Sequence, residues 1–251
     1  MTVPPLTILE RLEAERLTED NGFGLPQEEV DGWRTFTGLA CPHRLWIARL
    51  DGRWLIGLAH GGAMADVATD TPAAPVTRPD GGPAVAVDAL GPIIRRLFRL
   101  ARSLPTAPLD NFVAETRTLP KTTEAERLVV QRVGQAIFRT ALLDYWGGAC
   151  PLTGLTHPRL LRASHMKPWA VCATDAERLD IHNGLLLAAH LDAAFDAGLI
   201  SFTDAGDMLV SPALPPADRT RLAVDGMPPL AGLKPAHLPY LAIHRATVFQ
   251  A

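Results

Sequence analysis

The spacing of apolar residues divides the first half of the chain into short elements. Residues 6–17 have the period of a short amphipathic helix. Apolar runs over residues 44–50 and 53–58 flank Asp51-Gly52, which predicts a β-hairpin because glycine accepts the positive φ that a two-residue turn requires. Residues 89–103 predict a helix. Its apolar side consists of Ile93, Leu97 and Leu100.

Two stretches rich in proline interrupt this pattern, and a long helix follows them. We interpret residues 70–83 as a loop or linker and residues 105–120 as an irregular connector. Residues 123–126 form a capping box, so a helix should open there and run to about Trp146, where Gly147-Gly148 stops it. Its expected buried stripe is Val130, Val133, Ile137, Ala141 and Tyr145, and its expected polar stripe is Arg127, Gln131, Gln135 and Arg139.

The last third alternates short apolar runs with turns. Residues 150–212 therefore predict short strands with one short helix. Within them, residues 200–203 and 208–210 surround a polar turn and predict a second hairpin. We expect residues 241–245 to pack back on the body, and no internal repeat is present.

Composition places the chain among globular proteins. It has 251 residues, of which 47% are hydrophobic and 20% charged. No apolar run reaches the roughly 18 residues of a membrane span, and the start lacks the basic end and apolar stretch of a signal peptide, so we expect a cytoplasmic protein. Cys41, Cys150 and Cys172 lie far apart, which argues against a disulfide framework or a zinc knuckle and favours three buried thiols.

The net charge of −3 does not by itself indicate a nucleic-acid-binding protein. Its distribution is uneven, because basic residues gather in the middle of the chain. A locally positive region suits a phosphate substrate, although solvated helix faces account for each cluster equally well. The clusters are Arg95, Arg96, Arg99 and Arg102, then Arg117, Lys121, Arg127, Arg132 and Arg139, then Arg159, Arg162 and Lys167.

A short set of polar residues near the end of the basic region carries candidate chemistry. His165 ends one apolar-flanked segment, Asn183 opens an Asn-Gly turn, and His190 and Asp192 follow at once. Hydrolysis of a phosphodiester requires a base that activates water and a cation beside the phosphate oxygens, and a neutral histidine suits the first task. The Asn183 amide could bond a strand backbone, fix the ring's surroundings or give its oxygen to a metal. Oxygen ligands with imidazole suit Mg²⁺, Mn²⁺ or Zn²⁺.

Several of these runs together resemble the HNH endonuclease family, in particular its restriction-like bacterial subgroup that lacks zinc-knuckle cysteines. The resemblance covers roughly residues 130–212. It implies a ββα-metal fold in which a hairpin and a helix grip one divalent cation. Carried over, His165 matches the general base and Asn183 the central asparagine. The runs are Cys150-Pro151-Leu152-Thr153-Gly154, Ser164-His165-Met166-Lys167-Pro168-Trp169, Asn183-Gly184-Leu185-Leu186-Leu187 and Phe195-Asp196-Ala197-Gly198-Leu199-Ile200.

The chain departs from the family pattern at its third position. A histidine usually stands three residues before the Phe-Asp pair, where this chain has Asp192. His190 lies two residues earlier, so on a regular helix the two side chains would point about 200° apart. Either Asp192 replaces the usual ligand, or the helix begins after His190 and His190 binds from the strand end. Asp196 shares a face with Asp192, and Ser164 stands where many family members place a metal-binding Asp.

These observations predict an α+β protein with three parts. Residues 1–105 would form an N-terminal mixed α/β domain, with a β-hairpin and helices, that selects the substrate. Residues 121–215 would form the ββα-metal nuclease domain with its leading helix. Residues 216–251 would form a tail that packs on the body.

The predicted function is that of a metal-dependent HNH DNA endonuclease, with a restriction-like role. His165 would be the base, and Asn183 with His190 or Asp192 would hold the divalent metal ion. Arg159, Arg162 and Lys167 would contact nucleic acid. One alternative is a DNA-binding or regulatory protein on a degenerate, inactive scaffold, and another is a hydrolase that uses Cys150 or Cys172. The sequence leaves the oligomeric state open, a homodimer included.

Overall fold

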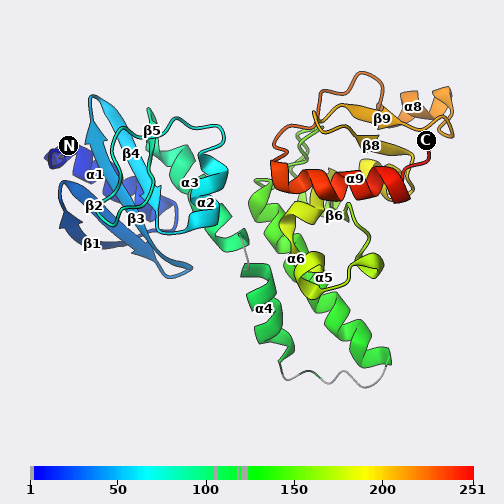
Figure 1. Ribbon diagram of the computed structural model, residues 1–251, viewed down its shortest axis with the longest axis horizontal. Coiled ribbons are helices and arrows are strands. Elements are labelled where there is room, and N and C mark those ends of the chain that lie inside the picture. Colours follow the sequence, from blue (N-terminus) through cyan, green and yellow to red (C-terminus); the bar gives the residue numbers. More distant parts are fainter. Residues whose placement is uncertain (1–2, 105–106, 118, 120–123) are drawn as a thin grey trace. The chain divides into compact units, whose positions relative to one another are not determined.

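The computed structural model describes residues 3–104, 107–117, 119 and 124–251, with the backbone alone for residues 124–127. The chain divides into two compact units, Met1–Pro105 and Thr106–Ala251. Each unit combines helices with strands (Figure 1), which confirms the expected α+β class. Among the residues just given, no helix is both long and apolar enough to cross a bilayer.

The N-terminal unit is built on a five-stranded antiparallel sheet whose strands lie in chain order. The predicted hairpin is confirmed, since Leu50 pairs with Arg53 across a two-residue turn. Asp51 and Gly52 adopt φ values of 49° and 78°, which is the left-handed geometry that favours Asp-Gly in such turns. The strands are β1 (Leu25–Val30), β2 (Trp33–Gly38), β3 (Cys41–Leu50), β4 (Arg53–Leu58) and β5 (Val85–Val87).

Helices cover one face of this sheet, and a loop with the N-terminal segment covers the other. The predicted helix over residues 89–103 is confirmed as α3 (Leu90–Ser103), which packs on β3, β4 and the short helix α2 (Gly61–Val67). Its predicted apolar side is buried. The predicted loop over residues 70–83 contains no regular strand or helix and supplies Ala74 and Val76 to the apolar cluster of the unit.

Helix α1 (Ile8–Asp20) lies where a helix was expected, but the expected amphipathic packing is wrong. Its Ile8 and Leu9 side chains are 78% and 79% exposed. The side that meets the sheet carries ion pairs instead, from Arg11 to Glu29 at 2.9 Å and from Glu15 to Arg34 at 2.8 Å. Charged residues on β1 and β2 therefore turn the polar side of the helix inward.

Two helices open the C-terminal unit. The expectation of an irregular connector over residues 105–120 is wrong, since α4 (Ala107–Thr116) forms there and buries Phe112. A proline near the start of a helix is tolerated because the first N–H groups lack intrahelical partners, and α4 packs on α5 (Glu124–Tyr145). The predicted capping box over residues 123–126 lies outside the described side chains.

Helix α5 ends where predicted, but its buried stripe differs from the prediction. Gly147 and Gly148 follow the helix with φ values of 70°, so they end it as expected. Of the predicted stripe, Ala141 is buried, whereas the other four side chains are only half-buried. The residues that face the core are Gly134, Phe138, Ala141 and Leu142.

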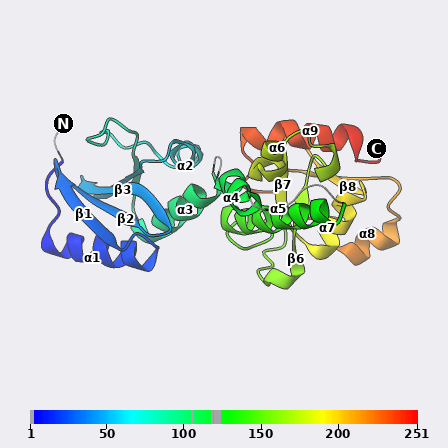
Figure 2. The same ribbon diagram turned by 90° about the horizontal axis from the view of Figure 1, so that it is seen from below.

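Short elements complete the C-terminal unit (Figures 1 and 2). The predicted second hairpin is confirmed by the pairing of Ile200 with Val210. The tail packs back as predicted, because Leu241 is buried and its helix contacts β8. The elements are β6 (Leu161–His165), α6 (Asp175–Leu179), β7 (Gly184–Ala188), α7 (Ala189–Asp196), β8 (Ile200–Phe202), β9 (Met208–Val210), α8 (Pro216–Leu222) and α9 (Leu238–Thr247).

Candidate functional site

Strands β6 and β7 with helix α7 place the predicted chemistry in one region. The two strands are antiparallel, and His165 at the end of β6 pairs with Gly184 at the start of β7. Asn183 precedes that glycine in a short 3-10 helix, Ile181–Asn183. Helix α7 begins directly after β7 and packs on both strands. A strand pair followed by a helix therefore brings residues 165, 183 and 192 into one substructure.

The imidazole of His165 is held by aromatic rings and one backbone carbonyl. It stacks on Phe138 with ring centres 3.9 Å apart, and it meets the edge of Trp169 at 5.5 Å. Its Nε2 lies 2.9 Å from the carbonyl oxygen of Arg178. A carbonyl only accepts, so Nε2 carries the proton and Nδ1 keeps its lone pair. Burial lowers the pKa of His165 and outweighs the opposite effect of the Arg178 carbonyl.

Asn183 braces the loop that follows β6. Its side chain is completely buried. Its Oδ1 accepts from the Lys167 amide at 2.8 Å, while its Nδ2 donates to the carbonyls of Lys167 at 3.2 Å and Glu177 at 3.1 Å. The sequence left three roles open for this amide: bonding a backbone, fixing the surroundings of the ring, or binding a metal. The contacts match the first role, hydrogen bonding to the backbone. These contacts do not support the expected metal-ligand role of Asn183, because its Oδ1 and Nδ2 both hydrogen-bond groups inside the protein.

Helix α7 separates the two candidates for the third position. The helix includes His190, so the alternative in which His190 binds from the strand end is wrong. His190 is exposed, and it points away from Asp192 by about 200° on a regular helix. Asp192 instead accepts a hydrogen bond from Ser164 of β6. The helical geometry therefore leaves Asp192, with its Ser164 partner, as the third-position residue that faces the strands.

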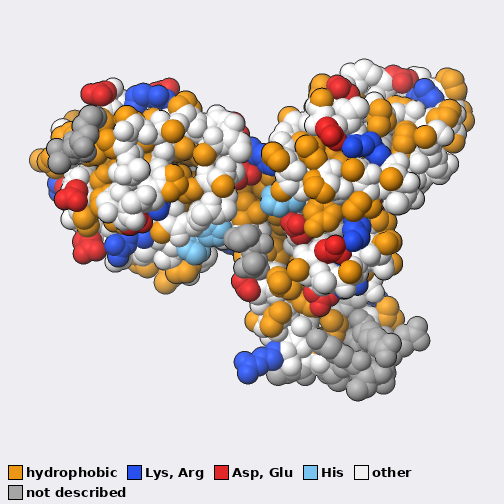
Figure 3. Space-filling model, in the orientation of Figure 1, with side chains coloured by type: hydrophobic (Ala, Val, Ile, Leu, Met, Phe, Trp, Pro, Cys, Tyr) orange, Lys and Arg blue, Asp and Glu red, His pale blue; other side chains and the backbone are white. Residues whose placement is uncertain are grey.

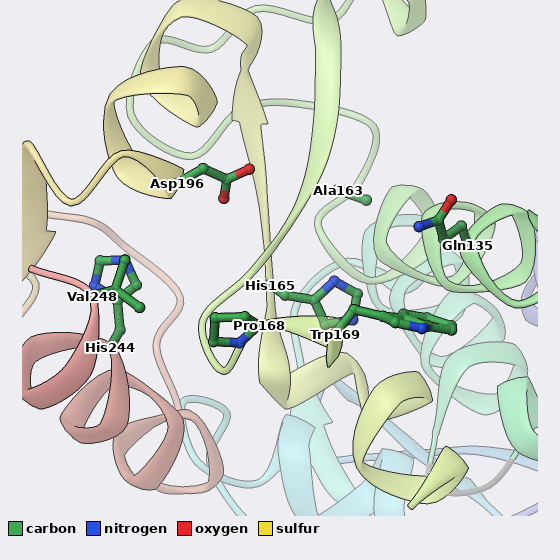
Figure 4. Close-up of a pocket in the computed structure, with 8 residues that line it drawn as sticks. All are labelled: Gln135, Ala163, His165, Pro168, Trp169, Asp196, His244 and Val248. Carbon is green, nitrogen blue, oxygen red and sulfur yellow. The ribbon is translucent and has the colours of Figure 1, made fainter. Parts of the chain in front are cut away.

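A pocket of about 400 Å³ lies beside these residues and includes His165 in its wall (Figure 4). Asp196, one turn beyond Asp192 on α7, lines the same pocket. Partial burial and the charge of Asp192 raise the pKa of Asp196 to about 6. The pocket therefore combines a neutral imidazole with an acidic group that titrates near neutrality. The lining residues are Gln135, Ala163, His165, Pro168, Trp169, Asp196, His244 and Val248.

His244 of α9 has a structural role in the pocket wall. It is buried and stacks on Phe195 with ring centres 3.7 Å apart. Its Nε2 donates to the Phe195 carbonyl at 3.1 Å, and its Nδ1 accepts from the Ser201 hydroxyl at 3.0 Å. Burial lowers its pKa to about 4. A neutral imidazole with both nitrogens bonded fits the structural role expected for a histidine outside the motif.

The carboxylates of Asp192 and Asp196 on α7 suit a hard divalent cation that takes its other ligands from water and substrate. The described part of the chain contains no group of three or more His, Cys, Asp or Glu side chains placed to hold a metal. Mg²⁺ is commonly bound by one or two carboxylates, with waters and substrate phosphates completing its shell. Asp192 and Asp196 lie four residues apart on one helix face. Burial and, to a smaller extent, the charge of Asp192 raise the pKa of Asp196, and a bound cation would relieve the repulsion between the two carboxylates.

The three predicted nucleic-acid contacts differ in their surroundings. Lys167 forms an ion pair with Glu177 at 2.9 Å, and its side chain is only 16% exposed, which does not support its expected phosphate contact. Arg162 is exposed, although its Nη1 donates to the carbonyls of Arg159 and Leu161. Arg159 is also exposed. Figure 3 shows basic, acidic and apolar side chains interspersed on the visible face of the C-terminal unit.

Sequence reasoning missed the residues that organise the loop between β6 and β7. Arg178 donates to the carbonyls of Trp169 and Cys172 at 3.3 and 2.5 Å, and its own carbonyl holds His165. Glu177 pairs with Lys167. A signal was present, because Thr174 and Glu177 have capping spacing and the Thr174 hydroxyl does accept from the Glu177 amide at 3.2 Å. That spacing could have located α6.

The cysteines lack the features of a catalytic nucleophile, although the Cys172 sulfur accepts from Asn183 Nδ2 at 3.5 Å. All three are free and buried, as expected from the sequence. Burial raises the pKa of Cys172, and a protonated buried thiol is a poor nucleophile. The alternative of a cysteine hydrolase therefore has no support here.

Comparison with known proteins agrees with the geometry of this region. Residues 150–203 match the sequence model of the HNH endonuclease family. No curated protein matches the chain. The matched segment contains β6, β7 and α7, and with them His165, Asn183 and Asp192. Residues 150–203, in the C-terminal half of the chain, are therefore similar to the HNH endonuclease family.

Proposed function

We propose that the protein is a metal-dependent endonuclease that hydrolyses phosphodiester bonds in DNA, with His165 as the general base. One observation carries the proposal. The Arg178 carbonyl holds the proton on Nε2 of His165, and no described residue hydrogen-bonds its Nδ1. The side chain lines the pocket that Asp196 also lines, so the imidazole and one carboxylate of α7 border the same cavity.

His165 is suited to take a proton from water at neutral pH. Burial lowers its pKa below the ordinary value, so the neutral ring predominates under physiological conditions. The stacked Phe138 and the edge of Trp169 restrict the ring to one orientation. A water molecule at Nδ1 would lose its proton to the ring as it attacks phosphorus.

Asp192 and Asp196 are the residues that would hold the divalent metal ion. Ser164 steadies Asp192. When bound, Mg²⁺, Mn²⁺ or Zn²⁺ would neutralise charge on the phosphate oxygens and on the leaving 3′ oxygen. Asn183 would act as a structural residue, because its side chain hydrogen-bonds the backbone of Lys167, two residues after His165.

The substrate assignment rests on charge and on the family match. Arg159 and Arg162 are exposed at the start of β6, where guanidinium groups would contact flanking phosphates. The N-terminal unit, residues 1–105, would select the DNA by sequence, shape or base modification. A restriction-like role follows from that division of labour.

Cleavage of supercoiled plasmid by the full chain tests the proposal, with Mg²⁺, Mn²⁺ and Zn²⁺ supplied in turn. The wild type should nick or linearise the plasmid with at least one metal. His165→Ala should lower the rate by about 10²- to 10⁴-fold, the usual contribution of a general base. His157→Asn is the matched control, because His157 is exposed and its Nδ1 accepts only from the nearby Arg159 amide among described residues, which asparagine can also do.

The opposite result would support the alternative function. Tight DNA binding without cleavage under any metal would identify a binding protein on an inactive scaffold. Equal cleavage by wild type and His165→Ala would remove His165 from the reaction.

A further inference from the structure

A hydroxyl group of the tail helix α9 bonds the segment between α6 and β7. Tyr240 donates to Oδ2 of Asp180 at 2.9 Å. Burial, together with the Asp180 charge, raises the pKa of Tyr240 above its ordinary value, so the phenol stays protonated and remains a donor. Tyr240 lies well beyond residue 203, where the family match ends. The contact therefore comes from a part of this chain that the family resemblance does not describe.

Asp180 stands at the junction between α6 and the short 3-10 helix Ile181–Asn183. Its Oδ1 accepts from the backbone amide of His182 at 2.9 Å and from the His182 ring at 3.0 Å. Burial acts to raise the pKa of Asp180, but these bonds and the Tyr240 hydroxyl outweigh it and lower the pKa. The carboxylate is therefore charged, and it is held from two directions.

Groups that organise the base and the backbone after it lie on either side of this junction. Two residues before Asp180, the Arg178 carbonyl fixes the tautomer of His165. Three residues after it, Asn183 fixes the backbone of Lys167. A shift of Asp180 would therefore displace both the Arg178 carbonyl that holds His165 and the Asn183 side chain that holds the Lys167 backbone.

We propose that Tyr240 is a positioning residue of the nuclease centre, acting on His165 through Asp180 and the Arg178 carbonyl. This inference rests on the proposed function, since it assigns a role in the same reaction. Leu179 and Ile181 are buried on either side of Asp180. Loss of the hydroxyl should therefore loosen the junction without unfolding it, and Tyr240→Phe should yield a folded protein.

Steady-state cleavage of a DNA duplex by the full chain gives the first readout. Tyr240→Phe should lower kcat by about tenfold, which corresponds to about 1.4 kcal/mol, and leave KM unchanged, because the hydroxyl touches no substrate. Thr247→Ala is the matched control, because it also removes a hydroxyl from α9. Among the described residues, this hydroxyl donates only to the Ile243 carbonyl of the same helix, at 2.8 Å. Its kcat should equal that of the wild type.

The ring of His165 gives a second readout that does not depend on activity. The ¹⁵N chemical shifts of the wild-type ring should show the Nε2–H tautomer, and Tyr240→Phe should populate the Nδ1–H tautomer as the Arg178 carbonyl loses its position. Asp180→Asn removes the charge of the group that accepts the Tyr240 hydrogen bond. In that background, Tyr240→Phe should have a smaller effect on both kcat and the tautomer population.

Tyr240→Phe that matches Thr247→Ala in both kcat and tautomer would overturn the inference. If the wild type cleaves no DNA, the proposed function fails by itself, and the tautomer measurement still decides whether Tyr240 positions the ring.

Discussion

Replacement of Asn183 distinguishes a structural brace from a metal ligand. The side chain is completely buried and makes three backbone hydrogen bonds of 2.8 to 3.2 Å, two to Lys167 and one to Glu177. Each such bond contributes about 0.5–1.5 kcal/mol net, and a buried group left unpaired costs about 1–3 kcal/mol. Asn183→Ala should therefore lower the free energy of unfolding by about 3–5 kcal/mol.

Asn183→Asp makes the comparison sharper. A carboxylate can still accept from the Lys167 amide, but its second oxygen would face two carbonyls in a buried site, where an uncompensated charge costs about 3–5 kcal/mol. The introduced carboxylate would be the stronger ligand if this position held a cation, so the ligand hypothesis predicts tighter metal binding for Asn183→Asp. If Asn183 is a structural brace, Asn183→Asp should instead be less stable than the wild type and should bind metal no more tightly.

Urea denaturation of the full chain, with hydrogen exchange at the Lys167 amide, measures the brace, and calorimetric titration with Mn²⁺ measures the metal. Asn111→Ala is the control, because Asn111 is exposed on α4 and should change stability by less than about 0.5 kcal/mol. Asn183→Asp that unfolds like the wild type and binds Mn²⁺ more tightly would refute the reasoning.

Three further predictions follow from the same contacts. In DNA-binding assays at several salt concentrations, Arg159→Ala should reduce the slope of log affinity against log salt by about 1. Lys167→Ala should leave this slope unchanged and should instead lower the free energy of unfolding, measured by denaturation. Gly184→Ala should cost about 1–3 kcal/mol in urea denaturation, because a Cβ there would lie 2.5 Å from Phe138; no loss would contradict the packing. Because the pKa of His244 is lowered to about 4, acid protonates this ring in the unfolded chain first, so from about pH 6.5 to 4 the wild type should lose about 3 kcal/mol relative to His244→Gln. Denaturation curves of equal pH dependence would show that His244 is not responsible.

Local chemistry made parts of the fold predictable. The Asp51-Gly52 turn and the apolar side of α3 are each set by residues close together in sequence, and both occur as predicted. Glycines at 147 and 148 end α5 for the same reason. By contrast, the prolines of residues 105–120 predicted an irregular segment, whereas residues 107–116 form α4 and bury Phe112.

Contacts between distant residues account for the errors in the N-terminal unit and for what spacing left open at the site. The apolar residues of α1 predict an inward face, but charges on β1 and β2 select the polar side instead. Spacing alone left three roles for Asn183, and only the fold shows that its partners are backbone groups of the loop. Lys167 looked available for phosphate until the fold supplied Glu177 as its partner.

The central claim is that His165 and Asp196, which line one pocket, act with Asp192 of the same helix in metal-dependent phosphodiester cleavage. Anomalous diffraction from crystals of the full chain soaked in Mn²⁺ tests this claim most directly. The account predicts a manganese peak at Asp192 and Asp196, on the pocket side of His165. A peak at Asn183 or at His190, with none at the α7 carboxylates, would contradict it.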